Sequence, residues 1–151
     1  MRLPLLVVGF LSLFVANHAP ASATTSSAVT IETTRYRGSP GVFTASGAFT
    51  DAGSFTTVKV HISGIGAPTF LIVHAVYEFT GDEGTFLLDL EIKETLTEDP
   101  ALLVGHGTWV IHSGTGAYAD LHGHGEVNGT VDEHTEPALF LRTYTGEVHF
   151  D

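Results

Sequence analysis

Cysteine is absent from the chain, and lysine and arginine are scarce. Without cysteine there is no disulfide framework, thiolate nucleophile, iron–sulfur cluster or cysteine–zinc site. Six Lys and Arg stand against 17 Asp and Glu, which gives a formal net charge of −11 with neutral histidine. Nucleic acids and anionic membrane surfaces bind clusters of basic side chains, so we expect neither as a partner.

A segment long enough to span a bilayer comfortably is also missing. The apolar stretch near the N-terminus, residues 3–16, follows Arg2 and precedes the small-residue sequence Ala21-Ser22-Ala23. This order is typical of a secretory signal peptide, and the short stretch disfavours the alternative, a retained membrane anchor. We therefore predict a secreted protein with a signal peptide at 1–23, a flexible mature N-terminus at 24–28 and one domain at 29–151.

Cleavage would remove Arg2 and no acidic residue, which leaves five basic and 17 acidic side chains and a net charge of −12. The simplest interpretation of this acidic excess is solubility outside the cell. The remaining 128 of the 151 residues suffice for one domain with its own core. A domain of this size buries roughly two-thirds of its unfolded surface.

The feature that is present is an alternation of apolar and polar residues with a period of two. Phe86, Leu88 and Ile92 fall on one face of an extended segment, while Asp89 and Glu91 fall on the other. Such runs are separated by Gly, Asp and Pro, the residues that tight turns require. Short strands at this regular spacing predict an all-β sandwich or closed barrel. We expect strands at about 29–37, 42–50, 54–63, 69–80, 85–96, 101–112, 121–131 and 138–149.

The glycine-rich stretch from 107 to 125 supplies a more specific pattern. It reads Gly-Thr-Trp-Val-Ile at 107–111, Ser-Gly-Thr-Gly-Ala-Tyr-Ala at 113–119 and Leu-His-Gly-His-Gly at 121–125. Together with the runs at 43–55, 84–88 and 144–146, this ordered set resembles the dirigent-like and allene oxide cyclase-like β-barrel proteins, including secreted bacterial members. The resemblance covers roughly residues 41–151.

This resemblance implies a small eight-stranded antiparallel barrel with a central cavity, a fold that often forms dimers or trimers. Characterised relatives include cyclases of fatty-acid epoxides, proteins that steer phenoxy-radical coupling, and cycloaddition catalysts. Their catalytic residues differ between branches, and no motif in this chain matches one branch. The resemblance therefore carries over the fold and no catalytic residue.

The residues of the glycine-rich stretch indicate structure rather than chemistry. Ser113-Gly114-Thr115-Gly116 would allow positive φ at two places, as a tight turn between strands requires. Ala117 and Tyr118 would then pack this turn onto the end of the barrel. Glycines in the following strand would leave room for a large side chain such as Trp109.

One predicted strand, 69–80, is apolar on both faces. Such a strand is buried on both sides, lines a cavity, or forms a subunit contact. His74 and Glu78 lie on one of its faces, and in an apolar lumen they could act as base and acid. Arg142 and Tyr144 share a face of the last strand. We predict these four as the polar set of a lumen site, the alternative being surface pairs under a loop or another subunit.

A metal site is one interpretation of His122, His124 and Glu126, which share one face of a predicted strand. The same residues equally fit the polar outer face of a barrel strand, and their spacing is not that of a known metal motif. His106 and His112 are interpreted in the same way. We therefore predict no metal and no cofactor.

Three functions remain open from the sequence. The first is a barrel that binds a small apolar molecule in its lumen or serves as a structural or interaction protein. The second is a cofactor-independent cyclase or isomerase that acts on a reactive apolar substrate in the lumen. The third is a secreted metal-binding protein. A homo-oligomer is compatible with each.

Overall fold

The computed structural model describes residues 25–66 and 69–151. The predicted signal peptide at 1–23 lies outside these residues. The described chain is all-β, and it contains no helix long and apolar enough to cross a membrane. The strands are β1 (Ser27–Tyr36), β2 (Gly41–Gly47), β3 (Asp51–Ser63), β4 (Phe70–Gly81), β5 (Gly84–Leu96), β6 (Leu102–Gly116), β7 (Leu121–Asp132) and β8 (Leu139–Phe150).

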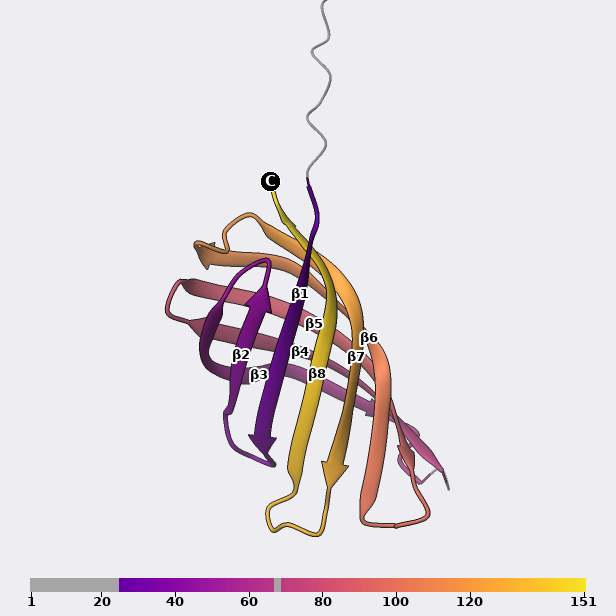
Figure 1. Ribbon diagram of the computed structural model, residues 1–151. Coiled ribbons are helices and arrows are strands. Elements are labelled where there is room, and N and C mark those ends of the chain that lie inside the picture. The colour runs from indigo at the N-terminus through magenta and orange to yellow at the C-terminus, as the bar shows by residue number, and fades with distance from the viewer. Residues whose placement is uncertain (1–24, 67–68) are drawn as a thin grey trace, which may run out of the picture.

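The eight strands form a closed antiparallel barrel, which confirms the predicted fold class. Each strand pairs with the next along the chain, and β8 returns to pair with β1 from Ser27↔Val148 to Tyr36↔Leu139. Figure 1 shows β3, β4 and β5 crossing behind the steeper strands β1, β7 and β8. The observed boundaries lie within four residues of the predicted ones, and Ser27 and Ala28 of the segment predicted as flexible belong to β1.

Alternation decides which side chains point into the barrel. In β5 the residues Phe86, Leu88 and Ile92 are buried, while Glu91 and Lys93 are exposed. Burial of each large apolar side chain contributes roughly 1.5–3 kcal/mol, so this face has to turn inward. The interior is packed with large side chains, of which these are fully buried: Trp109, Tyr77, Tyr118, Tyr144, Phe79, Phe86, Ile31, Leu88, Ile92, Ile111, Leu121 and Val127.

Aromatic rings fill the middle of the barrel. The ring of Phe79 stacks on Phe86 with centroids 4.8 Å apart and on Phe55 with centroids 5.1 Å apart. Phe43 meets both Phe79 and Phe86 edge to face. These offset and edge-to-face geometries are the favourable ones for aromatic pairs. The centre of the barrel is thus a packed core.

The glycine-rich stretch is structural, with one correction to its predicted turn. β6 continues through Gly114 to Gly116, so the turn lies at 117–120. Gly116 alone in the stretch has positive φ, +62°, because Gly114 remains extended inside the strand. Tyr118 packs into the barrel as predicted, whereas Ala117 is exposed.

Trp109 on β6 reaches across β7 to a space that a glycine leaves on β8, rather than to the predicted glycines of β7. A Cβ at Gly146 would lie 2.7 Å from the indole ring. The indole Nε1–H donates to the backbone carbonyls of Glu126 and Thr145, at 3.0 and 3.3 Å. The only tryptophan of the chain is therefore held as a core side chain with a satisfied donor.

The antiparallel order gives the barrel two different ends. The terminal end carries residues 27 and 150 and the short connections 48–50, 82–83 and 117–120. The loop end carries the connections 37–40, 64–69, 97–101 and 133–138, of which the last three are the longest in the barrel.

Candidate functional site

A buried ion pair lies inside the loop end of the barrel. The guanidinium of Arg142 on β8 donates to Glu94 Oε1 on β5, and the two side chains are only 6% and 7% exposed. Arg142 Nη1 also donates to the hydroxyl of Tyr77 on β4, at 3.1 Å. A Cβ at Gly129 would lie 2.7 Å from Arg142 Cγ, so glycine at that position makes room for the side chain. Strands distant in sequence thus meet at one polar layer.

Arg35 lies next to this layer at the loop end. Its Nη1 donates to the hydroxyl of Thr57 on β3, at 2.7 Å. Its guanidinium also lies 5.0 Å from the ring centroid of Phe140 and 5.4 Å from that of Tyr77. Cation–π contacts of this kind are attractive when the charge is partly shielded from water. Arg35 therefore links β1 to β3 where β2 no longer lies between them.

The guanidinium of Arg142 stays charged in spite of its burial. Burial alone would lower the pKa of Arg142, but the adjacent Tyr144, Tyr77 and Glu94 outweigh burial and raise it. Burial raises the pKa of Tyr144 to about 12. The Tyr144 hydroxyl is fully buried beside the Arg142 guanidinium, and no hydrogen bond of standard geometry reaches it within the described residues. A buried unsatisfied hydroxyl is destabilising, which makes this atom unusual in an otherwise satisfied layer.

Two of the four predicted lumen residues come together inside the barrel. Arg142 and Tyr144 both point inward from β8 and are buried. The prediction that His74 and Glu78 line the lumen is wrong, because both are exposed on the outer face of β4. The inner face of β4 is the other one, which carries Val73, Ala75, Tyr77 and Phe79. His74 lies instead beside Glu91 on the outside, with Nδ1 3.4 Å from the carboxylate.

Glu94 and Tyr77 are the members of the layer that sequence reasoning missed. Glu94 continues the parity of Leu90 and Ile92, so it is an acid on an apolar strand face. Buried acids of this kind are almost always paired, which was a usable signal for a cationic partner. Tyr77 lies on one of the two apolar faces of the strand predicted at 69–80, and only the register of the barrel brings its hydroxyl to Arg142.

The histidines considered as metal ligands lie on the outer face. His124 and Glu126 are exposed, and His122 is half-buried. Within residues 25–66 and 69–151, no three His, Asp or Glu side chains are grouped to hold a metal ion. His122 contacts Asp151 at 3.3 Å, His106 contacts the Asn128 side chain at 2.8 Å, and His112 contacts Asp89 at 3.1 Å.

A second buried polar group closes the terminal end. The hydroxyl of Tyr118 donates to Asp51 Oδ2 at 2.6 Å, and the backbone N–H groups of Ala52 and Asp82 donate to Oδ1. Burial alone would raise the pKa of Asp51, but these donors lower it. Burial and the neighbouring carboxylate raise the pKa of Tyr118. The rings of Phe49 and Phe86 pack on Tyr118 with centroids 5.1 and 5.4 Å away.

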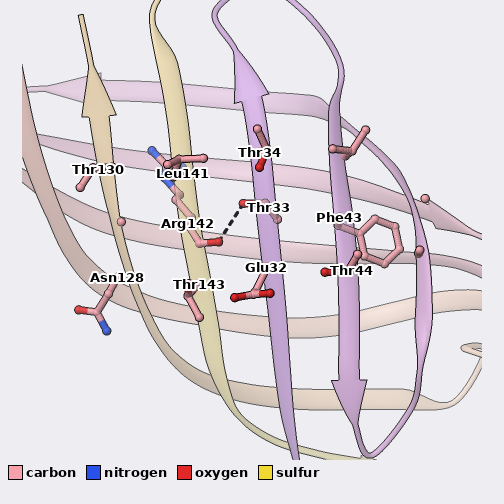
Figure 2. A pocket seen from close by; sticks show the side chains of 14 residues that line it. Glu32, Thr33, Thr34, Phe43, Thr44, Asn128, Thr130, Leu141, Arg142 and Thr143 are labelled. Carbon is pink, nitrogen blue, oxygen red and sulfur yellow. Dashed lines mark hydrogen bonds between the residues drawn. The ribbon is translucent and has the colours of Figure 1, made fainter.

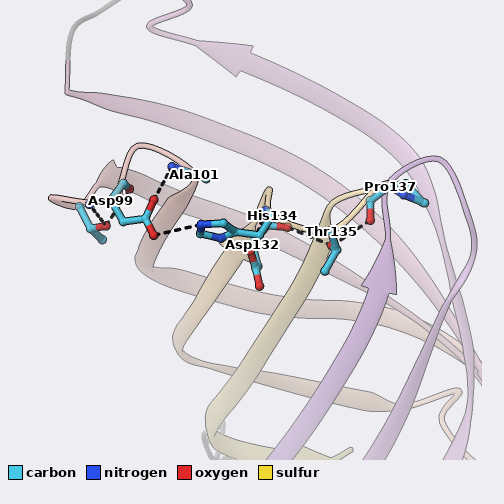
Figure 3. Close-up of polar contacts among 7 residues, drawn as sticks. Asp99, Ala101, Asp132, His134, Thr135 and Pro137 are labelled. Atoms are coloured by element: carbon cyan, nitrogen blue, oxygen red, sulfur yellow. Dashed lines mark hydrogen bonds and ion pairs between the residues drawn. The ribbon is translucent and has the colours of Figure 1, made fainter.

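His134 ties two connections together at the loop end. Its Nδ1 lies 2.8 Å from Asp132 and its Nε2 lies 3.2 Å from Asp99, so the imidazole bridges the connection after β7 and the one after β5 (Figure 3). The hydrogen bond to Asp132 and the charge of Asp99 raise the pKa of His134. The three side chains are largely exposed, and the bridge stands at the rim of the barrel rather than inside it.

Two concave places lie on the outer face of the described residues. A shallow depression of about 900 Å³ spreads over β7, β8, β1, β2 and β3, where Glu32, Thr34 and Thr143 point outward (Figure 2). A second, of about 740 Å³, lies over β3 to β6, and its charged and imidazole groups are Lys59, His61, His74, Asp89, Glu91 and His112. Both are open to solvent, unlike the packed interior.

Comparison with known proteins gives no further guide. No protein-family model, curated protein or solved structure matches the chain.

Proposed function

We propose that this protein is a structural or interaction barrel that works through its outer surface. The observation that carries this proposal is the filled interior, where Phe79, Phe86 and Leu88 are fully buried and the rings stack on one another. A carrier or a cyclase needs a lumen that admits its ligand. Here a ligand would first have to displace packed side chains, and each large side chain removed from such a core costs roughly 3–5 kcal/mol.

The charged groups of the interior support the same proposal. The carboxylate of Glu94 is engaged by Arg142, and that of Asp51 accepts bonds from Tyr118 and two backbone N–H groups. Each buried charge is therefore occupied by the protein itself. An acidic, cysteine-free chain with the N-terminal pattern of a signal peptide fits an interaction protein that is exported.

Ligand binding or cyclase chemistry in the lumen is the second candidate. The Tyr144 hydroxyl favours it, since this buried group beside Arg142 has no partner within the described residues. The resemblance to allene oxide cyclase-like barrels also supports it. In that case a polar atom of a ligand would reach Tyr144 from the loop end after Arg35 moves aside.

Uptake of benzene decides between a filled and a receptive barrel. We expect the melting temperature of the wild-type protein to be unaffected by saturating benzene. Phe79→Ala and Leu88→Ala should create apolar cavities that bind benzene, and binding should raise the melting temperature of these variants. Leu88→Ala serves as the second variant if Phe79→Ala does not fold. Stabilisation of the wild type by benzene, or by a longer apolar probe such as a fatty acid, would overturn the proposal.

A further inference from the structure

Part of β3 has no neighbour on one side. Residues 56–63, here called the free edge, pair with β4 from Thr56↔Glu78 to Ser63↔Ile72. On the opposite side, the β2 register stops at Gly41↔Phe55. Among the described residues no other strand continues this ladder. An unpaired strand edge presents a row of N–H and C=O groups that can accept another strand.

The two sides of the free edge differ in chemistry. Val60 and Ile62 pair with Ala75 and Val73, whose side chains point into the barrel, yet they are 53% and 41% exposed. Lys59 and His61 point to the outer face and are exposed. A strand added here would therefore meet apolar side chains on its inner side and basic or imidazole side chains on its outer side.

Charge makes this edge distinctive in an acidic protein. The chain beyond residue 23 has only five basic side chains against 17 acidic ones. Lys59 lies on the free edge, and Arg35 reaches it through its hydrogen bond to Thr57. The acids in register with the free edge are Glu78 on β4 and Asp89 and Glu91 on β5, all on the side away from an incoming strand.

We propose that the free edge binds an extended acidic segment of a partner protein, which adds to β3 as a further antiparallel strand. This rests on the proposed function, because it specifies the outer surface through which the barrel acts. Alternate apolar residues of the segment cover Val60 and Ile62, and its acidic residues lie beside Lys59 and His61. In such strand addition, main-chain hydrogen bonds supply affinity, and the alternating side chains supply specificity.

A second copy of this chain fits the free edge less well. An antiparallel two-fold pairing centred on Val60 would place Lys59 opposite His61 of the second copy, with no acid directly across. A β-bulge also interrupts the register between Thr57 and Lys59. A bulge and an edge lysine are features that protect strands from pairing with their own kind. An acidic strand would instead be attracted by the same lysine.

The test uses two capped eight-residue peptides labelled with fluorescein, one alternating valine with glutamate and one alternating valine with lysine. Fluorescence anisotropy measures their affinity for the whole protein. Hydrogen exchange locates the amides that the peptide protects. We expect the glutamate peptide to bind more tightly, to weaken with added salt, and to protect amides within 56–63.

Lys59→Glu and Lys93→Glu form a matched pair of variants. Both replace an exposed lysine, but Lys93 lies on the outer face of β5 beside Phe70, and β4 separates it from the free edge. We expect Lys59→Glu to weaken the glutamate peptide about tenfold or more and to improve binding of the lysine peptide, whereas Lys93→Glu should change affinity less than twofold.

Three outcomes would overturn the proposal. If Lys59→Glu and Lys93→Glu lose the same affinity for the glutamate peptide, the peptide is attracted by net charge alone. Protection outside 56–63 would place the site elsewhere. A concentration-dependent dimer that Val60→Asp abolishes, with no peptide binding, would assign the edge to a second copy. None of these alters the benzene result, so failure of the edge proposal is separable from failure of the filled-barrel proposal.

Discussion

The two ends of this barrel both bury a charged group, but they treat it differently. At the terminal end, hydrogen bonds from Tyr118 and two backbone N–H groups stabilise the Asp51 carboxylate, and the ring of Phe49 packs on Tyr118. At the loop end, Glu94 is neutralised by the full positive charge of Arg142. That ion pair lies in the same end of the barrel as the unpaired part of β3.

This difference between the two ends suggests that the terminal end closes the barrel and that the loop end binds another molecule. At the terminal end the turns are short, and backbone hydrogen bonds such as Ala117 N–H to Glu83 O and Ala48 N–H to Ala28 O close them. The loop end keeps a strand edge with unpaired backbone groups and half-exposed valine and isoleucine. The bulge and Lys59 protect this edge from a second copy of the chain, but they leave its backbone groups open to an acidic strand. The loop end is therefore where we expect another molecule to bind.

The largest effect should come from breaking the buried ion pair. Arg142→Ala leaves Glu94 buried without its partner, so we expect the free energy of unfolding to fall by about 3–5 kcal/mol in urea denaturation. The double variant Arg142→Met with Glu94→Leu should recover most of this loss, because apolar pairs often replace buried ion pairs without destabilisation.

Arg37→Ala is the matched control for this experiment. Arg37 pairs with Glu133 at the surface, where the two side chains are 56% and 42% exposed. Loss of an exposed pair should lower the free energy of unfolding by no more than about 1 kcal/mol. If Arg142→Ala and Arg37→Ala lower the free energy of unfolding by similar amounts, the buried ion pair is no more important for stability than the exposed one.

The next effect should come from the hydrogen bond at the terminal end. Tyr118→Phe removes the donor to Asp51, and we expect the free energy of unfolding at neutral pH to fall by about 1.5–3 kcal/mol. Because the pKa of Asp51 is lowered on folding, its stabilisation is present above its ordinary value of 3.8 and disappears as the pH falls further.

The pH profile checks that assignment. Wild-type stability should decline below about pH 4 more steeply than that of Tyr118→Phe. The pKa of Tyr118 is raised, so its own contribution is present below about pH 10 and is lost as the pH rises above that. Parallel acid profiles for the two proteins would show that Tyr118 does not stabilise the Asp51 carboxylate.

A smaller effect of opposite sign should follow from changing Tyr144. Its hydroxyl is buried without a partner within the described residues, so Tyr144→Phe should leave the free energy of unfolding unchanged or raise it by up to about 1 kcal/mol. Tyr77→Phe removes an acceptor from Arg142 and should lower that free energy by about 1 kcal/mol. A clear loss in Tyr144→Phe would reveal a partner for the hydroxyl.

The smallest effects belong to the outer face of β4. His74→Ala and Glu78→Ala should each change the free energy of unfolding by no more than about 0.5 kcal/mol, because both side chains are exposed. Urea denaturation checks this directly. Losses near those of Arg142→Ala would show that these side chains contribute to the core.

Much of the fold follows from local patterning. The alternation in β5 predicts its buried face, because a single-residue shift would turn every apolar side chain to solvent. The same parity places Arg142 and Tyr144 together, since both share the face of the buried Val148. Gly116 marks the end of β6, because its positive φ suits glycine.

Other features depend on register, which the sequence does not specify alone. β4 is apolar on both faces, so periodicity could not choose its inner face. Pairing of Val73 with Ile92 makes that choice and turns His74 outward. The free edge of β3 depends on where β2 leaves the sheet. A strand predicted at 42–50 gave no sign that its pairing with β3 would reach only from Gly41 to Ala45.

Native mass spectrometry of the purified protein tests the filled interior most directly. The mass of the folded protein under gentle conditions is compared with the mass of the chain after denaturation. The packed rings of Phe55, Phe79 and Phe86 predict equal masses and no small molecule released on unfolding. Release of an apolar molecule in stoichiometric amount would contradict a filled barrel and would assign the interior to a ligand.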